Sequence, residues 1–448
     1  MISSFRAVLL LGVAVLPALA ADAGTLQAGA AKIDITPAPD AALPMSGYSG
    51  RAEGFKGIHD HIYARAIVLS DGSKQAAILT WELVGVPTPV WEELSQRIAK
   101  ETGIQPEYLL LAAVHDHSAP TPRGIYGDKS DKAAEYTKHL EDAAVEAVQQ
   151  AKAKLQPAKI GIGTSSAYVN INRREESPNH QWGLGRNPDG PSDKTVSVIR
   201  VDALSGKPIA VFINYAVHAV VMGPDNYQVT GDLAGATSRF VENYYRRTPA
   251  DIPRGDAGYA MRLPREQAND GVVAIWTSGA AGDQNPIAVS AGQDFTMVDA
   301  LGQILGEAAV RAVNSIHTTQ DVRLFGKQEV ITCPGRTVAP GSPSGGEYKW
   351  NDADPVSIRL SLLMVNDIAL TAVSGEVLTR IYWHLKKDSP FNSTVMVTHT
   401  NGSSGYIPDD ASYGQVSYEI TTSHLKPGCA ENAIVNGFLD LMAQQGRQ

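Results

Sequence analysis

Short apolar runs of strand length alternate with amphipathic, helix-length segments along most of this chain, and this alternation constrains its fold more than any other feature. Gln75–Trp81 is typical of a strand, Val90–Thr102 of a helix, and Tyr108–Val114 of a second buried strand. A strand, a helix and a strand in this order predict a parallel pair joined by a crossover helix.

The same pattern continues toward the C-terminus. Further strands are expected at Lys159–Val169, Val196–Asp202, Ile209–Tyr215, Val272–Thr277, Val322–Val330, Ser357–Val365 and Ile368–Val373. Further helices are expected at Lys132–Lys154, Leu233–Tyr245, Met297–Ala312, Val377–Leu385 and Ala430–Gln444. Segments rich in Gly, Pro and polar residues predict long loops at Asn170–Lys194, Pro249–Asp270 and Pro334–Asp354. No repeat or Pro/Ser linker interrupts the pattern. We therefore predict the α/β class, as a single large domain with mixed β-sheets flanked by helices.

The first twenty residues have the pattern of a secretory signal peptide. Arg6 precedes an apolar run of about nine residues, Ala7–Val15, which is too short to span a membrane. Small residues at Ala18 and Ala20 fit a cleavage site after Ala20. A buried N-terminal helix is the alternative. The prediction is a signal peptide at residues 1–20, a mature domain at 21–448, and a secreted or periplasmic location.

Charge and cysteine content exclude some classes of partner. The chain carries 38 Lys+Arg and 47 Asp+Glu, a net charge of −9, which argues against nucleic-acid binding. No later stretch has eighteen consecutive apolar residues, so no transmembrane segment is expected. Cys333 and Cys429 either form a disulfide or remain two separate buried thiols. The sequence leaves the oligomeric state open.

One cluster of polar residues follows the strand predicted at Tyr108–Val114. His115 and His117 come directly after it, separated by one residue. If the chain stays extended, these two side chains point to opposite faces. Both can serve one metal ion only if the strand has already ended and the chain turns.

Three more clusters follow other apolar runs. His218 ends one run, Asp283 and Asn285 follow a Gly-rich turn, and Glu376 ends a third. Sites of α/β proteins gather at such strand ends. Two histidines and a glutamate fit a zinc site with imidazole and carboxylate ligands. The structural alternatives are a core histidine at His218 and helix-start carboxylates at Asp283 and Glu376.

In this order, these segments resemble the catalytic domain of the neutral ceramidase family, the zinc-dependent amidases that cleave N-acylsphingosine. The resemblance covers most of the mature chain. It rests on Ala31–Pro37, Met45–Tyr48, Gly57–Asp60, His115–Pro120, Asn170–Arg173, Tyr215–His218, Gly231–Gly235, Gly375–Glu376, Thr400–Asn401, Gly405–Pro408, Tyr413 and Tyr418–Glu419. It implies the family's catalytic domain alone, without its additional C-terminal β-sandwich.

The resemblance also implies roles for individual residues. The ligands of one zinc ion per chain would be His115, His218, Glu376 and Tyr406. Tyr418, twelve residues after Tyr406, corresponds to a substrate-contacting tyrosine of the family. Arg173 occupies the position of the family's Asn-Arg arginine, although Arg173–Glu176 also reads as a solvated run of charges. His117 corresponds to the second histidine, which is not a ligand.

The chain departs from the family pattern at two places. Asn285 replaces a serine that the family places next to the zinc water, and asparagine cannot become a nucleophile but can donate a hydrogen bond to an oxyanion. The segment Ala119–Arg123 replaces a Gly-rich stretch and stiffens a loop.

Together these residues predict a zinc-dependent amidohydrolase that cleaves a small-molecule or lipid N-acyl amide resembling ceramide with zinc-activated water. Tyr418, Arg173 and Asn285 would stabilise the oxyanion, and His117 would protonate the leaving amine. Two alternatives remain: a zinc hydrolase of the same fold acting on another small amide or ester, and a non-catalytic binding protein on the same scaffold.

Overall fold

The structure, a computed structural model, describes residues 24–49, 51, 53–123, 130–246, 271–338 and 349–445. The predicted signal peptide at residues 1–20 and the predicted loop at 249–270 lie outside these ranges. Within the described ranges, no helix is long and apolar enough to cross a membrane.

A large sheet of eight strands forms one layer of the molecule. Its strands, in spatial order, are β13 (Val273–Ser278), β11 (Pro208–Tyr215), β10 (Thr195–Ala203), β7 (Gln156–Ser166), β2 (Gln27–Asp34), β4 (Tyr63–Ser70), β5 (Gln75–Trp81) and β6 (Leu109–Ala113). The pairs β5–β6 and β11–β13 are parallel, and all other neighbours are antiparallel. Helix α1 (Thr88–Thr102) connects β5 to β6, which confirms the predicted parallel pair with its crossover helix.

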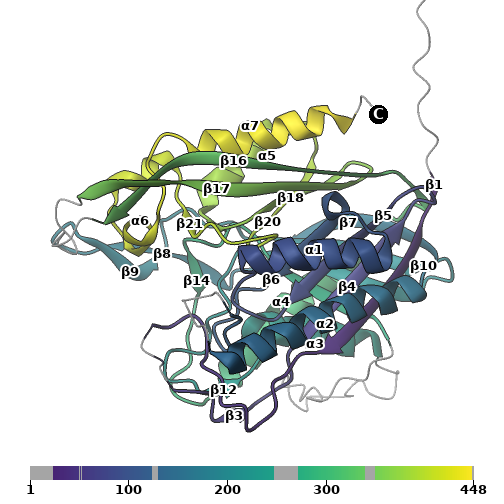
Figure 1. The fold of residues 1–448 in the computed structure, drawn as a ribbon, viewed down its shortest axis with the longest axis horizontal. Coiled ribbons are helices and arrows are strands. Elements are labelled where there is room, and N and C mark those ends of the chain that lie inside the picture. Colours follow the sequence, from purple (N-terminus) through teal and green to yellow (C-terminus); the bar gives the residue numbers. More distant parts are fainter. Residues whose placement is uncertain are drawn as a thin grey trace, which may run out of the picture.

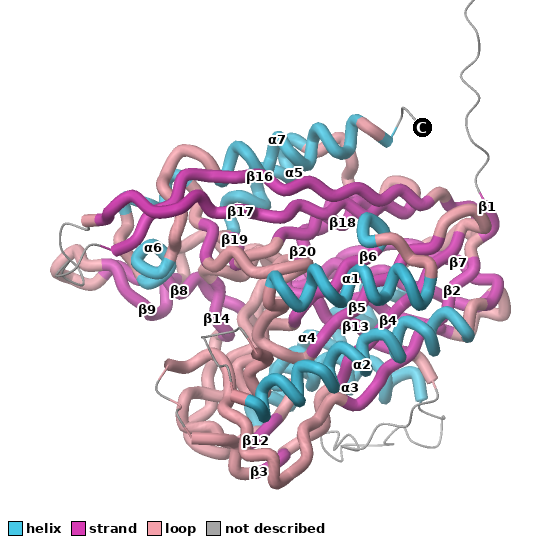
Figure 2. Tube along the Cα trace, viewed as in Figure 1, coloured by secondary structure: helices cyan, strands magenta, loops and turns pink. Residues whose placement is uncertain are grey.

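A smaller sheet lies against the large one (Figure 1). Its strands are β16 (Leu324–Val338), β17 (Trp350–Val365), β18 (Ile368–Val373) and β20 (Ser393–Val397), and only β18 and β20 run parallel. Helices α5 (Thr379–Asp388) and α7 (Ala430–Ala443) cover its outer face (Figure 2).

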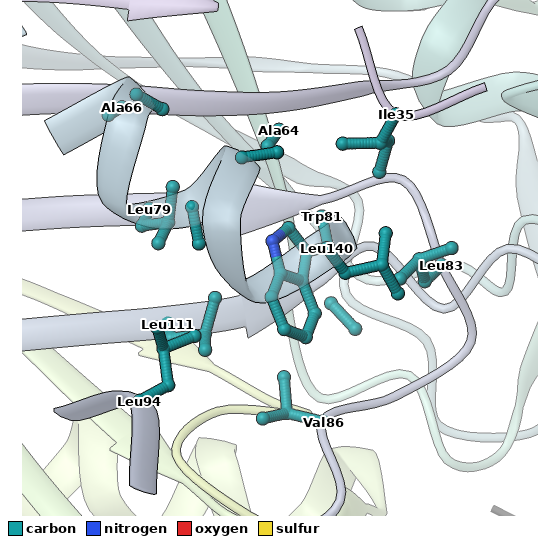
Figure 3. Packing of buried hydrophobic residues seen from close by; sticks show 14 of the residues in the cluster. Ile35, Ala64, Ala66, Leu79, Trp81, Leu83, Val86, Leu94, Leu111 and Leu140 are labelled. Carbon is teal, nitrogen blue, oxygen red and sulfur yellow. The ribbon is translucent and has the colours of Figure 1, made fainter. Parts of the chain in front are cut away.

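The alternation of side chains along each strand produces four layers. In β5, Leu79 and Trp81 pack with α1 and with α2 (Asp131–Ala153), whereas Ile78 faces the smaller sheet. In β11, alternate residues pack in the same way against α3 (Asp232–Arg246) and α4 (Thr296–Asn314). The order of layers is therefore helices, large sheet, small sheet, helices. Figure 3 shows the buried side chains around Trp81 on the helix side. Mixed sheets flanked by helices in a single large domain confirm the predicted fold class.

Short ladders complete the fold. They are β1 (Gly24–Thr25) with β15 (Asp321–Val322), β3 (Gly57–Ile58) with β12 (Gln228–Val229), β19 (Glu376–Val377) with β21 (Tyr406–Ile407), and the three-stranded sheet of β14 (Gln284–Pro286), β8 (Asn170–Glu176) and β9 (Trp182–Asn187). The short helix α6 (Tyr418–Thr422) follows β21.

Two predicted loops are in part strands, so those predictions were wrong. Asn170–Lys194 contains the β8–β9 hairpin, and the two ends of Pro334–Asp354 extend β16 and β17, with residues 339–348 outside the described ranges. A register shift between Cys333 and Gly335 accommodates Pro334, because a bulge tolerates a residue without an N–H. In β8 the polar side chains of Arg173 and Arg174 are buried against partners of opposite charge, so a polar composition there does not indicate a surface loop.

Cys333 and Cys429 are bonded to each other. The bond ties β16 to the residue that precedes α7 and closes a loop of 96 residues. Of the two alternatives for these cysteines, the structure therefore has the disulfide.

Candidate metal and active site

The residues predicted to form the site follow the C-terminal ends of strands from both sheets. His115 follows β6, His218 follows β11, and Glu376 follows β18. Each of these strands belongs to a parallel pair, and ligand sites lie at the carboxyl ends of such strands. The fold thus brings together residues that are far apart in sequence.

His115 and His117 face the same space. Strand β6 ends at Ala113, and His115 has a φ of 64°, a left-handed conformation that turns the chain. As a result the Nε2 atoms of the two rings lie 3.2 Å apart. Of the two arrangements considered for this pair, the structure has the one in which the strand has ended and the chain turns.

The hydrogen bonds of His115 and His218 orient their rings. His115 Nδ1 donates to the Val84 carbonyl (2.7 Å), and His218 Nδ1 lies 2.9 Å from the Ala281 carbonyl. Because a carbonyl only accepts, both Nδ1 atoms carry the proton, and both Nε2 atoms present a lone pair. Each Nε2 lies 3.4 Å from Oε2 of Glu376.

Glu376 and Tyr406 lie side by side because β19 and β21 pair with these two residues in register. The two-stranded ladder fixes their relative position far better than a loop would. Tyr406 accepts a hydrogen bond from Nη2 of Arg173 (2.8 Å). Asp283, by contrast, accepts from the backbone N–H of Thr379, the first residue of α5. The helix-start alternative therefore describes Asp283, whereas Glu376 faces the histidines.

Arg173 connects the remaining residues of the site. Its guanidinium is buried: Nε donates to Oε1 of Glu419 (2.6 Å), and Nη1 lies 3.0 Å from Nε2 of His218 and 3.3 Å from Oδ1 of Asn285. These contacts overturn the alternative of a solvated charge run at this position. The Tyr418 ring packs edge-on against Tyr406, with centroids 5.6 Å apart, and its side chain is 44% exposed. It therefore lies at the rim of the site.

Burial favours the neutral forms of His117, His218 and Tyr406. Burial, together with the neighbouring Arg173, lowers the pKa of His218 to about 3. Burial also lowers the pKa of His117 well below its usual range. Burial raises the pKa of Tyr406 well above its ordinary value.

These residues fit a metal ion. Two imidazole lone pairs and a carboxylate oxygen converge, and Oε2 of Glu376 is buried without a hydrogen-bond partner among the described residues. Acceptors that face one another repel unless a cation lies between them. Two groups of possible ligating atoms, each within 4.8 Å, surround the site: His115, His117 and His218, and His115, Glu376 and His399.

Two residues of this region have no role in the sequence analysis. His399 stacks on His115, with ring centroids 3.9 Å apart, and Glu419 holds Arg173. His399 directly precedes the segment Thr400–Asn401 that was used for the family resemblance, and Glu419 lies within the segment Tyr418–Glu419, where it was given no role. The only sequence signal that could have pointed to His399 is that it is a histidine directly before the segment Thr400–Asn401.

A cavity of about 690 Å³ lies next to this group. His115, Glu376 and His399 form part of its wall, which also includes Val86 after β5 and Val356 of β17. Its volume falls in the range of small-molecule sites. The candidate site therefore has an adjoining space for a ligand.

Comparisons with known proteins identify the family of this chain. Residues 26–298 match the family described as neutral/alkaline non-lysosomal ceramidase, N-terminal. Neutral ceramidase A of Dictyostelium discoideum is 28% identical over 239 residues, which are 50% of this chain and 32% of the relative. The neutral ceramidase of Pseudomonas aeruginosa is 27% identical over 251 residues, 53% of this chain and 37% of the relative. These alignments span about a third of the length of the relatives.

Two solved structures share the fold. One, a ceramidase complexed with C2, aligns with a TM-score of 0.73 and 17% identity over 94% of this chain and 75% of that chain. The other, a neutral ceramidase from Pseudomonas aeruginosa, aligns with a TM-score of 0.71 and 17% identity, over 95% and 75% of the two chains.

Proposed function

Since this chain belongs to the neutral/alkaline non-lysosomal ceramidase family, we propose that it is a zinc-dependent hydrolase that cleaves the C–N bond of a linear N-acyl amide such as ceramide. The single observation that carries the proposal is the convergence of His115 Nε2, His218 Nε2 and Glu376 Oε2 described above. Two histidines and one glutamate are a donor set of catalytic zinc sites.

One zinc ion would be held by His115, His218, Glu376 and Tyr406. Bound zinc supplies Lewis acidity, which polarises a carbonyl and makes water nucleophilic near neutral pH. The protein orients these ligands through backbone contacts, such as the bonds from the two Nδ1 atoms to carbonyls.

Arg173, Tyr418 and Asn285 would stabilise the negative charge that develops on the carbonyl oxygen. Arg173 brings a buried positive charge, and Glu419 fixes its orientation. Asn285 accepts from Arg173 through Oδ1, which leaves its amide N–H groups for the substrate oxygen. Tyr418 has the exposure expected of a residue that meets substrate at the rim.

His117 would protonate the leaving amine. Its Nε2 lies 3.2 Å from Nε2 of His115, so this ring nitrogen faces the residues that would hold the ion. With its proton on Nε2, His117 would bring a donor into the site. That proton would pass to the amine nitrogen as the C–N bond breaks, and the proton released by the attacking water would replace it on His117.

A second candidate is a hydrolase of the same fold acting on another small amide or an ester. Asn285, which stands where the family has a serine, favours it because this residue adjoins Arg173 at the centre of the site. Loss of catalysis, leaving a binding protein, is the third possibility.

The test is to purify the chain, measure its zinc content, and assay ceramide together with a panel of N-acyl amides and esters. His115→Ala and Glu376→Ala are expected to lose zinc and activity together. The exposed His139→Ala on α2 serves as the matched control and should change neither. Stoichiometric zinc with no hydrolysis of any panel member would refute an enzyme, and absence of zinc would refute the metal site. Activity that survives Asn285→Ala but not His115→Ala would favour water as the nucleophile.

We also propose export of the chain through the signal peptide at residues 1–20. The disulfide between Cys333 and Cys429 supports an oxidising compartment. N-terminal sequencing of the protein from culture medium and periplasm should give Ala21 as the first residue, whereas a cytoplasmic protein that begins at Met1 would refute export.

A further inference from the structure

His399 is a buried histidine in the site for which neither the family resemblance nor the proposed mechanism has a use. Its backbone N–H donates to the Gly375 carbonyl, and its own carbonyl accepts from the N–H of Ala113. These bonds anchor it between the ends of two strands, with a φ of 54°. A left-handed conformation at a residue other than glycine is held in place by its surroundings and is most common at functional sites.

The ring of His399 cannot share a metal ion with His115. The two rings are stacked, with centroids 3.9 Å apart and planes only 15° apart. The lone pair of an imidazole nitrogen lies in the plane of its ring, so two nearly parallel, stacked rings do not direct their lone pairs at one point. The closeness of His399, His115 and Glu376 is therefore not evidence that they form one coordination shell.

The ring nitrogen Nε2 of His399 is buried and has no hydrogen-bond partner among the described residues. A buried polar atom left without a partner costs about 1–3 kcal/mol, so such an atom in a site calls for a partner from outside the chain. The residue His399 lines the 690 Å³ cavity together with Glu376. Its Nε2 atom is itself buried behind the cavity wall, so a molecule bound there supplies the partner when the ring turns toward it.

We propose that His399 is a substrate-contacting residue, whose Nε2 hydrogen-bonds a polar atom of the N-acyl amide on the cavity side of the metal group. The proposal rests on the hydrolase function proposed above and deepens it. It places part of the substrate in the cavity, whose lining residues do not include Tyr418. It also divides the histidines by role: His115 and His218 hold the ion, His117 moves a proton, and His399 recognises the substrate.

Two variants separate a hydrogen bond from a packing role. His399→Phe keeps a flat ring that stacks on His115 but has no nitrogen. His399→Gln loses the ring but places an amide group near the position of Nε2. The exposed His139→Phe on α2 is the matched control. For each protein, we would measure zinc content, and kcat and KM with N-hexanoylsphingosine as the probe.

For His399→Phe we expect unchanged zinc content and a kcat/KM about tenfold lower. A tenfold change corresponds to the free energy of one lost hydrogen bond. His399→Gln should recover to within about threefold of the wild-type value. Loss of zinc from His399→Phe would make His399 a ligand and overturn the proposal, as would a wild-type kcat/KM in that variant. An equal defect in both variants would also overturn it, because glutamine still offers the hydrogen bond. A wild-type protein that holds zinc but cleaves no amide would instead refute the hydrolase function itself.

Discussion

Replacement of Glu419 by glutamine tests whether a buried carboxylate holds the arginines of the site in place. Glu419 is fully buried: Oε1 accepts from Nε of Arg173 at 2.6 Å, and Oε2 lies 3.7 Å from Nε of Arg174. Oε2 also accepts from the hydroxyl of Ser417 (2.6 Å). Glutamine has the same shape but no charge, so the substitution removes the ionic part of these contacts with little change in packing.

The expected loss of stability follows from the burial of both partners. Removing one member of a buried ion pair costs about 3–5 kcal/mol, because the other charge is left uncompensated. Glutamine retains one oxygen that can accept from Arg173, so we expect the lower end, about 3 kcal/mol in the free energy of unfolding. Loss of orientation of Arg173 should also lower kcat/KM, since this guanidinium also contacts Tyr406 and Asn285.

Urea denaturation followed by tryptophan fluorescence measures the change in stability. Glu176→Gln is the matched control, because Glu176 is also paired, with His180 at 2.8 Å, but its side chain is 43% exposed and that of its partner 88%. The control should change stability by less than about 0.5 kcal/mol. A Glu419→Gln protein less than about 1 kcal/mol below the wild type, with unchanged kcat/KM, would refute the idea that Glu419 holds Arg173.

Three further predictions concern parts of the fold away from the site. Burial, together with Arg65, lowers the pKa of Lys32 from 10.5 to about 8. Above pH 8 the unfolded chain therefore binds more protons than the folded one. The free energy of unfolding should then rise toward pH 10 by up to about 1.4 kcal/mol per pH unit. Denaturation at several pH values should show this rise in the wild type and not in Lys32→Met. The disulfide closes a loop of 96 residues. Its reduction, or the double change Cys333→Ser and Cys429→Ser, should therefore lower the free energy of unfolding by about 4 kcal/mol. Equal unfolding midpoints with and without reductant would contradict this prediction. Trp81→Ala should lower the free energy of unfolding by about 3–5 kcal/mol, because it leaves a cavity in the core. Trp81→Phe should lower it by less than about 1.5 kcal/mol, because it keeps most of the packing and removes an indole N–H that has no partner among the described residues. The half-exposed Trp383→Ala is the control, and a similar loss in all three variants would contradict the packing argument.

Local sequence pattern was sufficient for the most regular elements of the fold. Strand β5 has the predicted bounds, and α1 ends at Thr102 as predicted, because Gly103 adopts the left-handed conformation that terminates a helix. Strands β2 and β4 were not predicted, although both are largely buried. Their charged residues, Lys32 and Arg65, interrupt the apolar pattern, and only the tertiary structure pairs both with Glu242.

The sequence also supplied all eight residues predicted for the site, and the fold brings them together. The sequence indicated these residues through the order of the motifs along the chain. Their spacing gave no indication, since more than a hundred residues separate His115 from His218 and His218 from Glu376. The roles of these residues remain predictions. His399 and Glu419 were missed because their significance depends on what they touch: a stacked ring in one case, a buried arginine in the other.

The sequence by itself determined the class of fold, the family and the donor atoms available for a metal ion, because hydrophobic periodicity and residue chemistry are local properties. The tertiary structure decided the direction of each donor. The left-handed turn at His115 brings His117 to the same space, and the β19–β21 ladder places Glu376 beside Tyr406. It also decided that Arg173 lies inside the protein, paired with Glu419, instead of in solvent. Such outcomes depend on contacts between residues distant in the chain, which no local pattern records.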